Sequence, residues 1–210
     1  IEGAPSKGGT DYAIFVDGGD CRFDGNVGIG TTTPDVALHI TKTATGGVLR
    51  LENSDTTITA DEVLGQIEFE GQDASTNASG VRAKIAAFGS TGGVTGETDI
   101  AFYTSIAGDN LSEKMRIQDD GNVGIGETAP LGKLHIRTAD SGGSVNAAAD
   151  ELVVEGSGDA GITILSGNTS NARILFADSG GTANGVVQYN GDTNFMAFHT
   201  SAGERMRILS

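Results

Sequence analysis

The stretch DGNVGIG occurs twice in this chain, at residues 24–30 and again at residues 120–126, so its period is 96 residues (120 minus 24). Each copy continues through a proline to Leu-His-Ile, and the longer segments read DGNVGIGTTTPDVALHI and DGNVGIGETAPLGKLHI. A match of this length within one chain indicates an internal repeat, which is typical of folds that stack copies of one structural unit. The architecture must therefore be one that can be repeated.

A second pair of similar stretches supports the repeat. DIAFYTSIAGDNLSEKMRIQ at residues 99–118 is similar to NFMAFHTSAGERMRILS at residues 194–210, with a small deletion in the later copy. Deletions of this kind are tolerated where surface loops join the elements. The chain is predicted to hold the end of one repeat at residues 1–43, a complete repeat at residues 44–139 and most of a further repeat at residues 140–210.

Apolar residues within each repeat come in short runs that alternate with polar ones, which is the pattern of β-strands. Clusters of Gly, Ser, Thr, Asn and Asp separate the runs, as expected of tight turns. The predicted fold class is all-β, built from repeated meanders of short strands. The runs are VLRLEN at residue 48, GQIEFEG at 65, VRAKIAAFG at 81, DIAFYTS at 99, KMRIQ at 114, GITILSG at 161, ARILFADS at 172 and GVVQYN at 185.

Within DGNVGIG, the Asp-Gly-Asn predicts a hairpin or bend, because Gly and Asn accept the backbone conformations of such turns. In the strand that follows, valine and isoleucine lie on one face and the glycines on the other. Glycine weakens a strand, so a whole glycine face makes sense where another backbone approaches closely. We predict that three copies of the chain wind around a common axis with the branched side chains inward. The predicted trimer core and close-approach positions are Val27, Gly28, Ile29, Gly30, Leu38, Ile40, Val123, Gly124, Ile125, Gly126, Leu134 and Ile136.

The composition also favours an oligomer. The 210 residues include 33 glycines, 8 phenylalanines and 3 tyrosines but no tryptophan, so few large side chains are present to close a monomeric core. Aromatic side chains normally supply much of the buried area of a core. A chain of this kind is expected to bury its apolar residues against copies of itself.

Charge and cysteine content restrict the partners. The net charge is −15 and the basic residues are scattered, so nucleic acid is not an expected partner. No apolar run approaches the roughly 18 residues that span a membrane. Cys21 is the only cysteine, which leaves no disulfide framework or paired-cysteine metal motif and suits assembly in a reducing cytosol. Because the first residue is not methionine, we expect an internal segment of a longer protein.

These motifs carry a family likeness. DGNVGIGTTTP followed by ALHI, EKMRI or ERMRI upstream of the same motif, and VEGSGDAGITILSGNTSNARILFADSGG together resemble the repeated shaft region of phage tail fibres, particularly those of marine and cyanobacterial phages. The resemblance implies an elongated, intertwined homotrimeric β fibre. It implies contact with other fibre or baseplate proteins, and with a host cell-surface glycan or protein through a distal tip. It also implies assembly in the host cytoplasm, a place in the virion and an extracellular location after release.

Several motifs contain residues that could form a chemical site, but a structural role is expected for each. GIGTTTP lacks the lysine of a phosphate-binding loop and the third glycine of a dinucleotide motif. His39 and His135 occupy equivalent places, and three imidazoles around an axis offer metal ligands, but alternation with Leu38 and Ile40 predicts outward-facing histidines. The aspartates at positions 17, 20, 24, 119 and 120 lie beside turns, where capping is expected more than calcium binding. No cofactor or metal is predicted.

The sequence contains no specific signal for catalysis, and its repeated arginines are expected to form ion pairs. No pair of carboxylates is singled out for glycan cleavage and no nucleophile motif is present, so the chain is not expected to be an enzyme. Arg116 and Arg207 each follow a methionine in the repeated MRI strand, where an ion pair to a neighbouring chain is favoured over simple covering of apolar surface. The alternatives to a fibre shaft are a glycan-binding or glycan-cleaving tailspike domain and a bacterial adhesin or extracellular filament repeat.

Overall fold

The computed structural model describes residues 22–73, 78–90, 96–106, 111–201 and 203–209. The described residues form strands, turns and extended segments without a helix, so the chain is all-β as predicted. None of the described residues therefore belongs to a helix long and apolar enough to cross a membrane. Cys21, Asp17 and Asp20, which entered the sequence predictions, lie outside the described residues.

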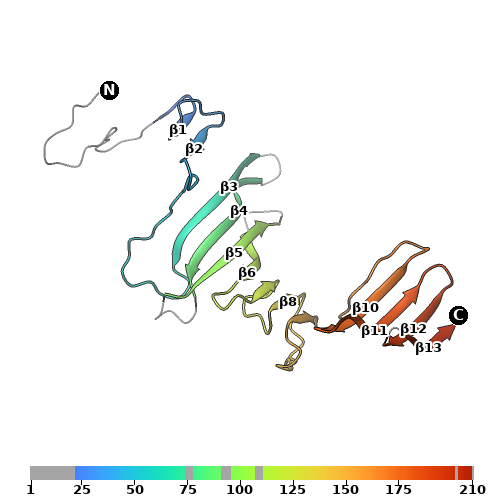
Figure 1. The fold of residues 1–210 in the computed structure, drawn as a ribbon. Coiled ribbons are helices and arrows are strands. Elements are labelled where there is room, and N and C mark those ends of the chain that lie inside the picture. Colours follow the sequence, from blue (N-terminus) through green and yellow to red (C-terminus); the bar gives the residue numbers. More distant parts are fainter. Residues whose placement is uncertain (1–21, 74–77, 91–95, 107–110, 202, 210) are drawn as a thin grey trace. The chain divides into compact units, whose positions relative to one another are not determined.

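The strands form three sheets (Figure 1). The first is a parallel pair, β1 (Val27–Ile29) and β2 (Leu38–Ile40). The second has seven strands in sequential order: β3 (Val63–Asp73), β4 (Ala78–Gly89), β5 (Thr98–Ser105), β6 (Leu111–Ile117), β7 (Val123–Ile125), β8 (Leu134–Arg137) and β9 (Leu152–Glu155). The third is an antiparallel meander of β10 (Asn171–Asp178), β11 (Gly181–Asn190), β12 (Phe195–Thr200) and β13 (Gly203–Leu209).

The seven-stranded sheet changes from antiparallel to parallel pairing at β7, its fifth strand. Strands β3 to β7 are antiparallel neighbours, whereas β7, β8 and β9 pair in parallel. The hairpin predicted from Asp-Gly-Asn joins β6 to β7: Gly121 has a φ of +81°, and Asp120 Oδ1 accepts from the backbone N–H of Asn122 at 2.8 Å. Asp120 therefore acts as the turn cap expected from the sequence.

Two predicted strands are absent from the described sheets. Residues 48–53 and 161–167 have the alternating apolar pattern, yet they lie outside every sheet. Their apolar side chains are open to solvent, with 73% of Val48 and 89% of Leu165 exposed. The pattern predicts an extended backbone, but a strand exists only where a second strand is beside it, and the sequence pattern does not report the neighbour.

The apolar core within the chain is small. The buried hydrophobic residues among those described are Ala86, Phe88, Ala101 and Ala197, and Tyr103 packs against the first three. Contacts divide the chain into two compact units, residues 1–54 and residues 55–210. This division does not test the repeat boundaries predicted after residues 43 and 139. Those boundaries remain predictions.

Candidate functional site: an open apolar sheet face

One face of the seven-stranded sheet consists of aligned apolar side chains. Backbone register places one residue of every strand in each of two rows that run across the sheet. The first row is Ile67, Ile85, Phe102, Met115, Ile125, Ile136 and Val154; the second is Gly65, Ala87, Ile100, Ile117, Val123, Leu134 and Leu152. We call these two rows the apolar face.

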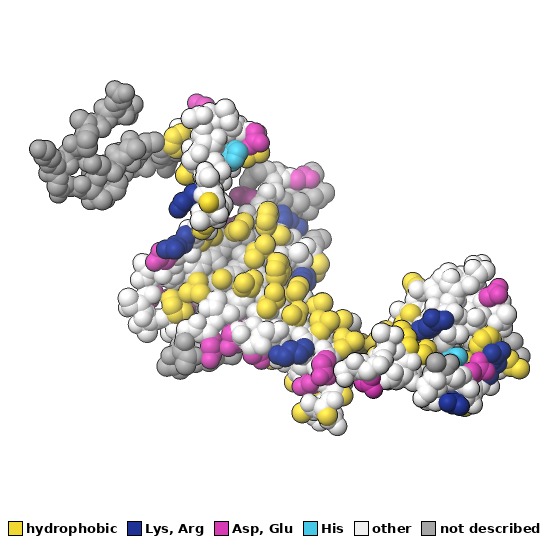
Figure 2. Space-filling model, viewed as in Figure 1, with side chains coloured by type: hydrophobic (Ala, Val, Ile, Leu, Met, Phe, Trp, Pro, Cys, Tyr) yellow, Lys and Arg dark blue, Asp and Glu magenta, His cyan; other side chains and the backbone are white. Residues whose placement is uncertain are grey.

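The apolar face is open to solvent. No residue of either row is buried, and the exposed fractions reach 45% for Ile67 in the first row and 51% for Leu152 in the second. Hydrophobic side chains gather over this sheet in Figure 2. Soluble monomers rarely expose large contiguous apolar patches, and such patches mark interaction surfaces. The face is therefore the candidate functional site.

The opposite face carries charges and is the more enclosed of the two. The residues aligned there between the two apolar rows include Ala86, Ala101, Arg116, Gly124 and His135, all of them buried. We call this the charged face. The usual arrangement of a soluble sheet is thus inverted, because this chain covers its polar side and leaves its apolar side open.

Arg116 is the central charge of that face. Its Nη1 donates to Asp99 Oδ2 at 2.9 Å, while Nε and Nη2 donate to the two oxygens of Glu113 at 2.9 and 2.8 Å. The hydrogen bonds to Glu113 raise the pKa of the guanidinium. Burial, followed by the charge of Glu113, raises the pKa of Tyr103. The ion pair that the sequence analysis assigned to a neighbouring chain is made within the chain, because β5 places Asp99 beside β6.

The predicted core positions of the second copy lie on the apolar face. Val123 and Ile125 of β7 and Leu134 and Ile136 of β8 belong to its two rows, and Gly124 lies on the charged face as alternation requires. The apolar residues of β3 to β6 lie in the predicted strands, but they are not among the site residues predicted from the sequence. The signal that would have found them is the shared alternation of VRAKIAAFG and DIAFYTS, read as one face.

The glycines of this copy allow the chain's own backbone to approach. A side chain on Gly124 would overlap the carbonyl oxygen of Glu127, and one on Gly126, whose φ is +73°, would overlap the carbonyl oxygen of Arg137. The close approach expected from a sister chain is thus already made within the chain. Whether sister chains contact the same glycines stays a prediction.

The first copy has the same backbone arrangement. Gly28 lies against the carbonyl oxygen of Thr31, and Gly30, with a φ of +80°, lies against that of Thr41. Its predicted core residues, Val27 and Ile29 on β1 and Leu38 and Ile40 on β2, pair in the register seen for β7 and β8. None of these four side chains is buried, and 52% of Ile29 is exposed.

His135 lies on the face opposite Leu134 and Ile136, as alternation predicts, but the expectation that this face is exposed is wrong. The bend at residues 126–133 covers it, and the exposed fraction of His135 is 0%. His39, the equivalent residue, has a side chain that is 32% exposed and places its Nδ1 2.9 Å from Asp35 Oδ1. Alternation fixes the face of a residue but does not show which face a loop covers.

His135 belongs to a buried polar cluster with Glu127 and Glu155, whose ligand atoms lie within 4.8 Å of one another. The backbone N–H of Leu131 donates to His135 Nδ1 at 3.3 Å, so the ring hydrogen of the neutral imidazole is on Nε2. Nε2 lies 3.0 Å from Glu155 Oε2, but the two atoms are not aligned for a hydrogen bond. A metal at Nε2 would require the opposite tautomer. We therefore interpret the cluster as a set of structural polar contacts that hold β8, β9 and the covering bend together.

The carboxylates of the cluster have further partners. Glu127 accepts from the backbone N–H of Ala129 at 2.7 Å and pairs with Arg137. Glu155 accepts from the backbone N–H and the hydroxyl of Ser141, both at 2.7 Å, and these bonds lower the pKa of the Glu155 carboxyl. Sequence reasoning missed Glu155 because β9 lies 16 residues beyond the β8 motif and contains no feature of the DGNVGIG repeat.

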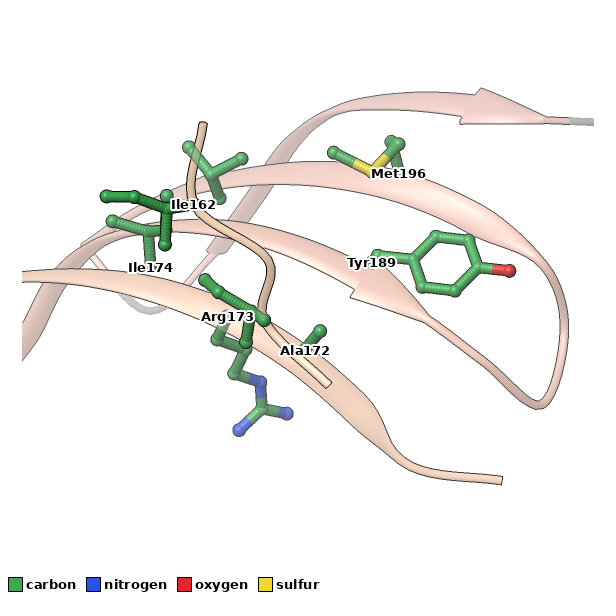
Figure 3. Close-up of a pocket in the computed structure, with 8 residues that line it drawn as sticks. Ile162, Ala172, Arg173, Ile174, Tyr189 and Met196 are labelled. Atoms are coloured by element: carbon green, nitrogen blue, oxygen red, sulfur yellow. The ribbon is translucent and has the colours of Figure 1, made fainter. Parts of the chain in front are cut away.

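The four-stranded sheet also has an apolar side, part of which is covered by the segment that contains Ile162. Its polar side carries Arg173 bonded to Gln188 Oε1 at 2.7 Å and Arg207 bonded to Glu204 at 2.9 and 2.7 Å. On the other side, Ile162 lies over the sheet and, together with Ile164, lines a cavity of about 190 Å³ (Figure 3). The aligned residues of that side are Ala172, Ile174, Val187, Tyr189, Met196, Phe198, Met206 and Ile208.

The fold and this face define an all-β chain with two sheets that each expose an apolar side. No protein-family model matches the chain, and no curated protein matches it.

Proposed function

We propose that this chain is a structural segment of a phage tail fibre, in which three copies associate along their repeats and form a rigid shaft. The observation that carries the proposal is the open apolar face where it crosses the DGNVGIG copy on β7 and β8. Burial of apolar surface contributes roughly 25 cal/mol per Å², so association of such faces is strongly favourable. A face of this kind is closed by one partner or shared around an axis by three, and the tail-fibre resemblance favours three.

The role that follows is mechanical. Separating the copies would expose the rows of every repeat together, so dissociation would be slow and the shaft would hold its length under load. The acidic surface, from a net charge of −15, keeps neighbouring fibres apart in solution. The partners are other copies of the chain, other fibre or baseplate proteins, and a distal tip that contacts a host cell-surface glycan or protein.

The proposal is tested by the mass of the purified chain in solution. Light scattering coupled to size exclusion should give three times the chain mass of 21.3 kDa, and electron microscopy should show rods. The variant Val123→Asp places a charge in the second row and should give a smaller species. The matched control is Thr128→Asp, an exposed position in the bend over the charged face, which should leave the trimer intact.

A wild-type chain that stays monomeric at all concentrations would overturn the proposal. So would a Val123→Asp variant with three-chain mass and an unchanged melting temperature. Far-ultraviolet circular dichroism of each variant shows whether the strands are retained, and this separates loss of association from loss of folding.

A further inference from the structure

The apolar face extends well beyond the DGNVGIG motif. Ile67, Ile85, Phe102 and Met115 continue the row of Ile125, Ile136 and Val154 without a break across β3 to β6. We propose that this meander part of the face, β3 to β6, is a second interface region that packs against another copy of the same chain. The inference rests on the proposed function for the identity of the assembly, and it adds a contact surface to it.

The apolar face is large enough to supply about half of a standard interface. Seven strands spaced about 4.8 Å apart, with two rows of residues, give an apolar area of roughly 450 Å². Each partner contributes about 800 Å² to a standard interface. The β7 to β9 portion alone supplies less than half of the roughly 450 Å².

The chemistry of the face selects an uncharged partner surface. Neither row contains a charged side chain, whereas Lys84, Glu113 and Arg116 lie on the charged face. Copies of a chain with a net charge of −15 repel one another through their other surfaces. The apolar face is therefore the side through which two copies approach with the least electrostatic cost.

The repetition of the face identifies the partner as another copy. On the four-stranded sheet, the row Ile174, Val187, Phe198 and Met206 occupies the strand positions of Ile67, Ile85, Phe102 and Met115. The same residue types thus recur at the same register in successive repeats. A partner that presents matching apolar rows at this period is the chain itself.

The test uses adjacent residues that point to opposite faces of β3. Ile67 lies on the apolar face and Gln66 on the charged side of the sheet, and both are exposed in the single chain. In a Cys21→Ser background, Ile67→Cys and Gln66→Cys are each labelled with a maleimide in the native assembly. We expect the cysteine at position 67 to react roughly tenfold more slowly than the one at 66, because labelling then requires local opening.

The second measurement is the mass of Ile67→Asp and Gln66→Asp. We expect Ile67→Asp to lower the assembly mass or its melting temperature, while Gln66→Asp matches the wild type. If the wild type and Thr128→Asp are trimers and Val123→Asp is not, but positions 66 and 67 label equally fast and Ile67→Asp assembles normally, the meander interface is overturned while the fibre proposal stands. Binding of a monomeric wild type to phosphatidylcholine vesicles would overturn both and assign the face to lipid.

Discussion

The two copies of DGNVGIG fold in the same way but are buried to different extents. Both form a parallel pair in the same register, and both bend at a glycine with positive φ, Gly30 in one and Gly126 in the other. Gly28 is nevertheless exposed, whereas Gly124 is buried. The local sequence determines the backbone path, and the surroundings determine the burial.

The surroundings differ in three ways. The second copy is joined on one side to β6 and on the other to β9, so its pair becomes part of a wide sheet. Glu127 and Arg137 stand where the first copy has Thr31 and Thr41, and they form an ion pair across the bend. Equivalent substitutions in the two copies should therefore lower the free energy of unfolding by unequal amounts.

The largest difference is expected at the arginines of the repeated MRI strands. Arg116→Met leaves the buried Asp99 and the partly buried Glu113 without their cation and should lower the free energy of unfolding by about 3–5 kcal/mol. Arg207→Met removes an exposed pair to Glu204, which water and salt screen, and should lower the free energy of unfolding much less. Both are measured by denaturant unfolding at one fixed chain concentration, because oligomer stability depends on concentration. Equal losses would show that burial does not distinguish the two copies.

The next difference is expected at the glycines of the bend. Gly124→Val forces the Glu127 carbonyl away in an enclosed site and should cost about 3 kcal/mol. Gly28→Val meets the carbonyl of Thr31 on an open bend that can shift, so about 1 kcal/mol is expected. Thermal unfolding of the two variants checks the order. A greater loss for Gly28→Val would contradict the proposed role of the surrounding sheet.

The histidines give a smaller contrast. His135→Ala removes an enclosed ring and leaves the Leu131 N–H without its acceptor, which should cost about 2 kcal/mol. His39→Ala removes a partly exposed ring and should change stability by less than about 0.5 kcal/mol. If the cluster of His135, Glu127 and Glu155 is structural, zinc or a chelator should leave the melting temperature of the wild type unchanged. A metal-dependent increase that His135→Ala abolishes would instead make the cluster a metal site.

Exchanging the bend residues between the two copies tests directly whether the Glu127–Arg137 pair stabilises the second copy. Glu127→Thr gives the second copy the residue of the first, whose hydroxyl can keep the cap on the Ala129 N–H, as Thr31 Oγ1 accepts from the Thr33 N–H at 3.1 Å, but it loses the pair with Arg137. About 1 kcal/mol of stability should be lost. The reverse change, Thr31→Glu, has no arginine to meet at Thr41 and should be neutral in the same denaturant measurement. A stabilising Thr31→Glu would mean that the bend needs no cation partner.

The contrast between the two copies also shows which features of the fold could be predicted from the sequence and which could not. Alternation correctly placed Val123 and Ile125 on one face and Gly124 on the other, because side-chain direction in a strand is a local property. The burial of His135 and its contact with Glu155 depend on a bend and on a later strand, which local patterns do not encode. Residues 48–53 and 161–167 show the same limit, since their extended pattern does not specify a neighbouring strand.

The smallest expected effect is on the stability of the fold at low pH. Ser141 donates two hydrogen bonds to Glu155 and lowers the pKa of this carboxyl below its ordinary value of 4.5. Because the folded pKa is the lower one, the stabilisation is present above pH 4.5 and is lost as the pH falls through the folded pKa. Ser141→Ala removes the hydroxyl donor and should move the pKa of Glu155 upward, so that the acid loss begins at higher pH. Carbon NMR of the Glu155 carboxyl measures the shift, and an unchanged titration in Ser141→Ala would show that the backbone N–H alone holds the charge.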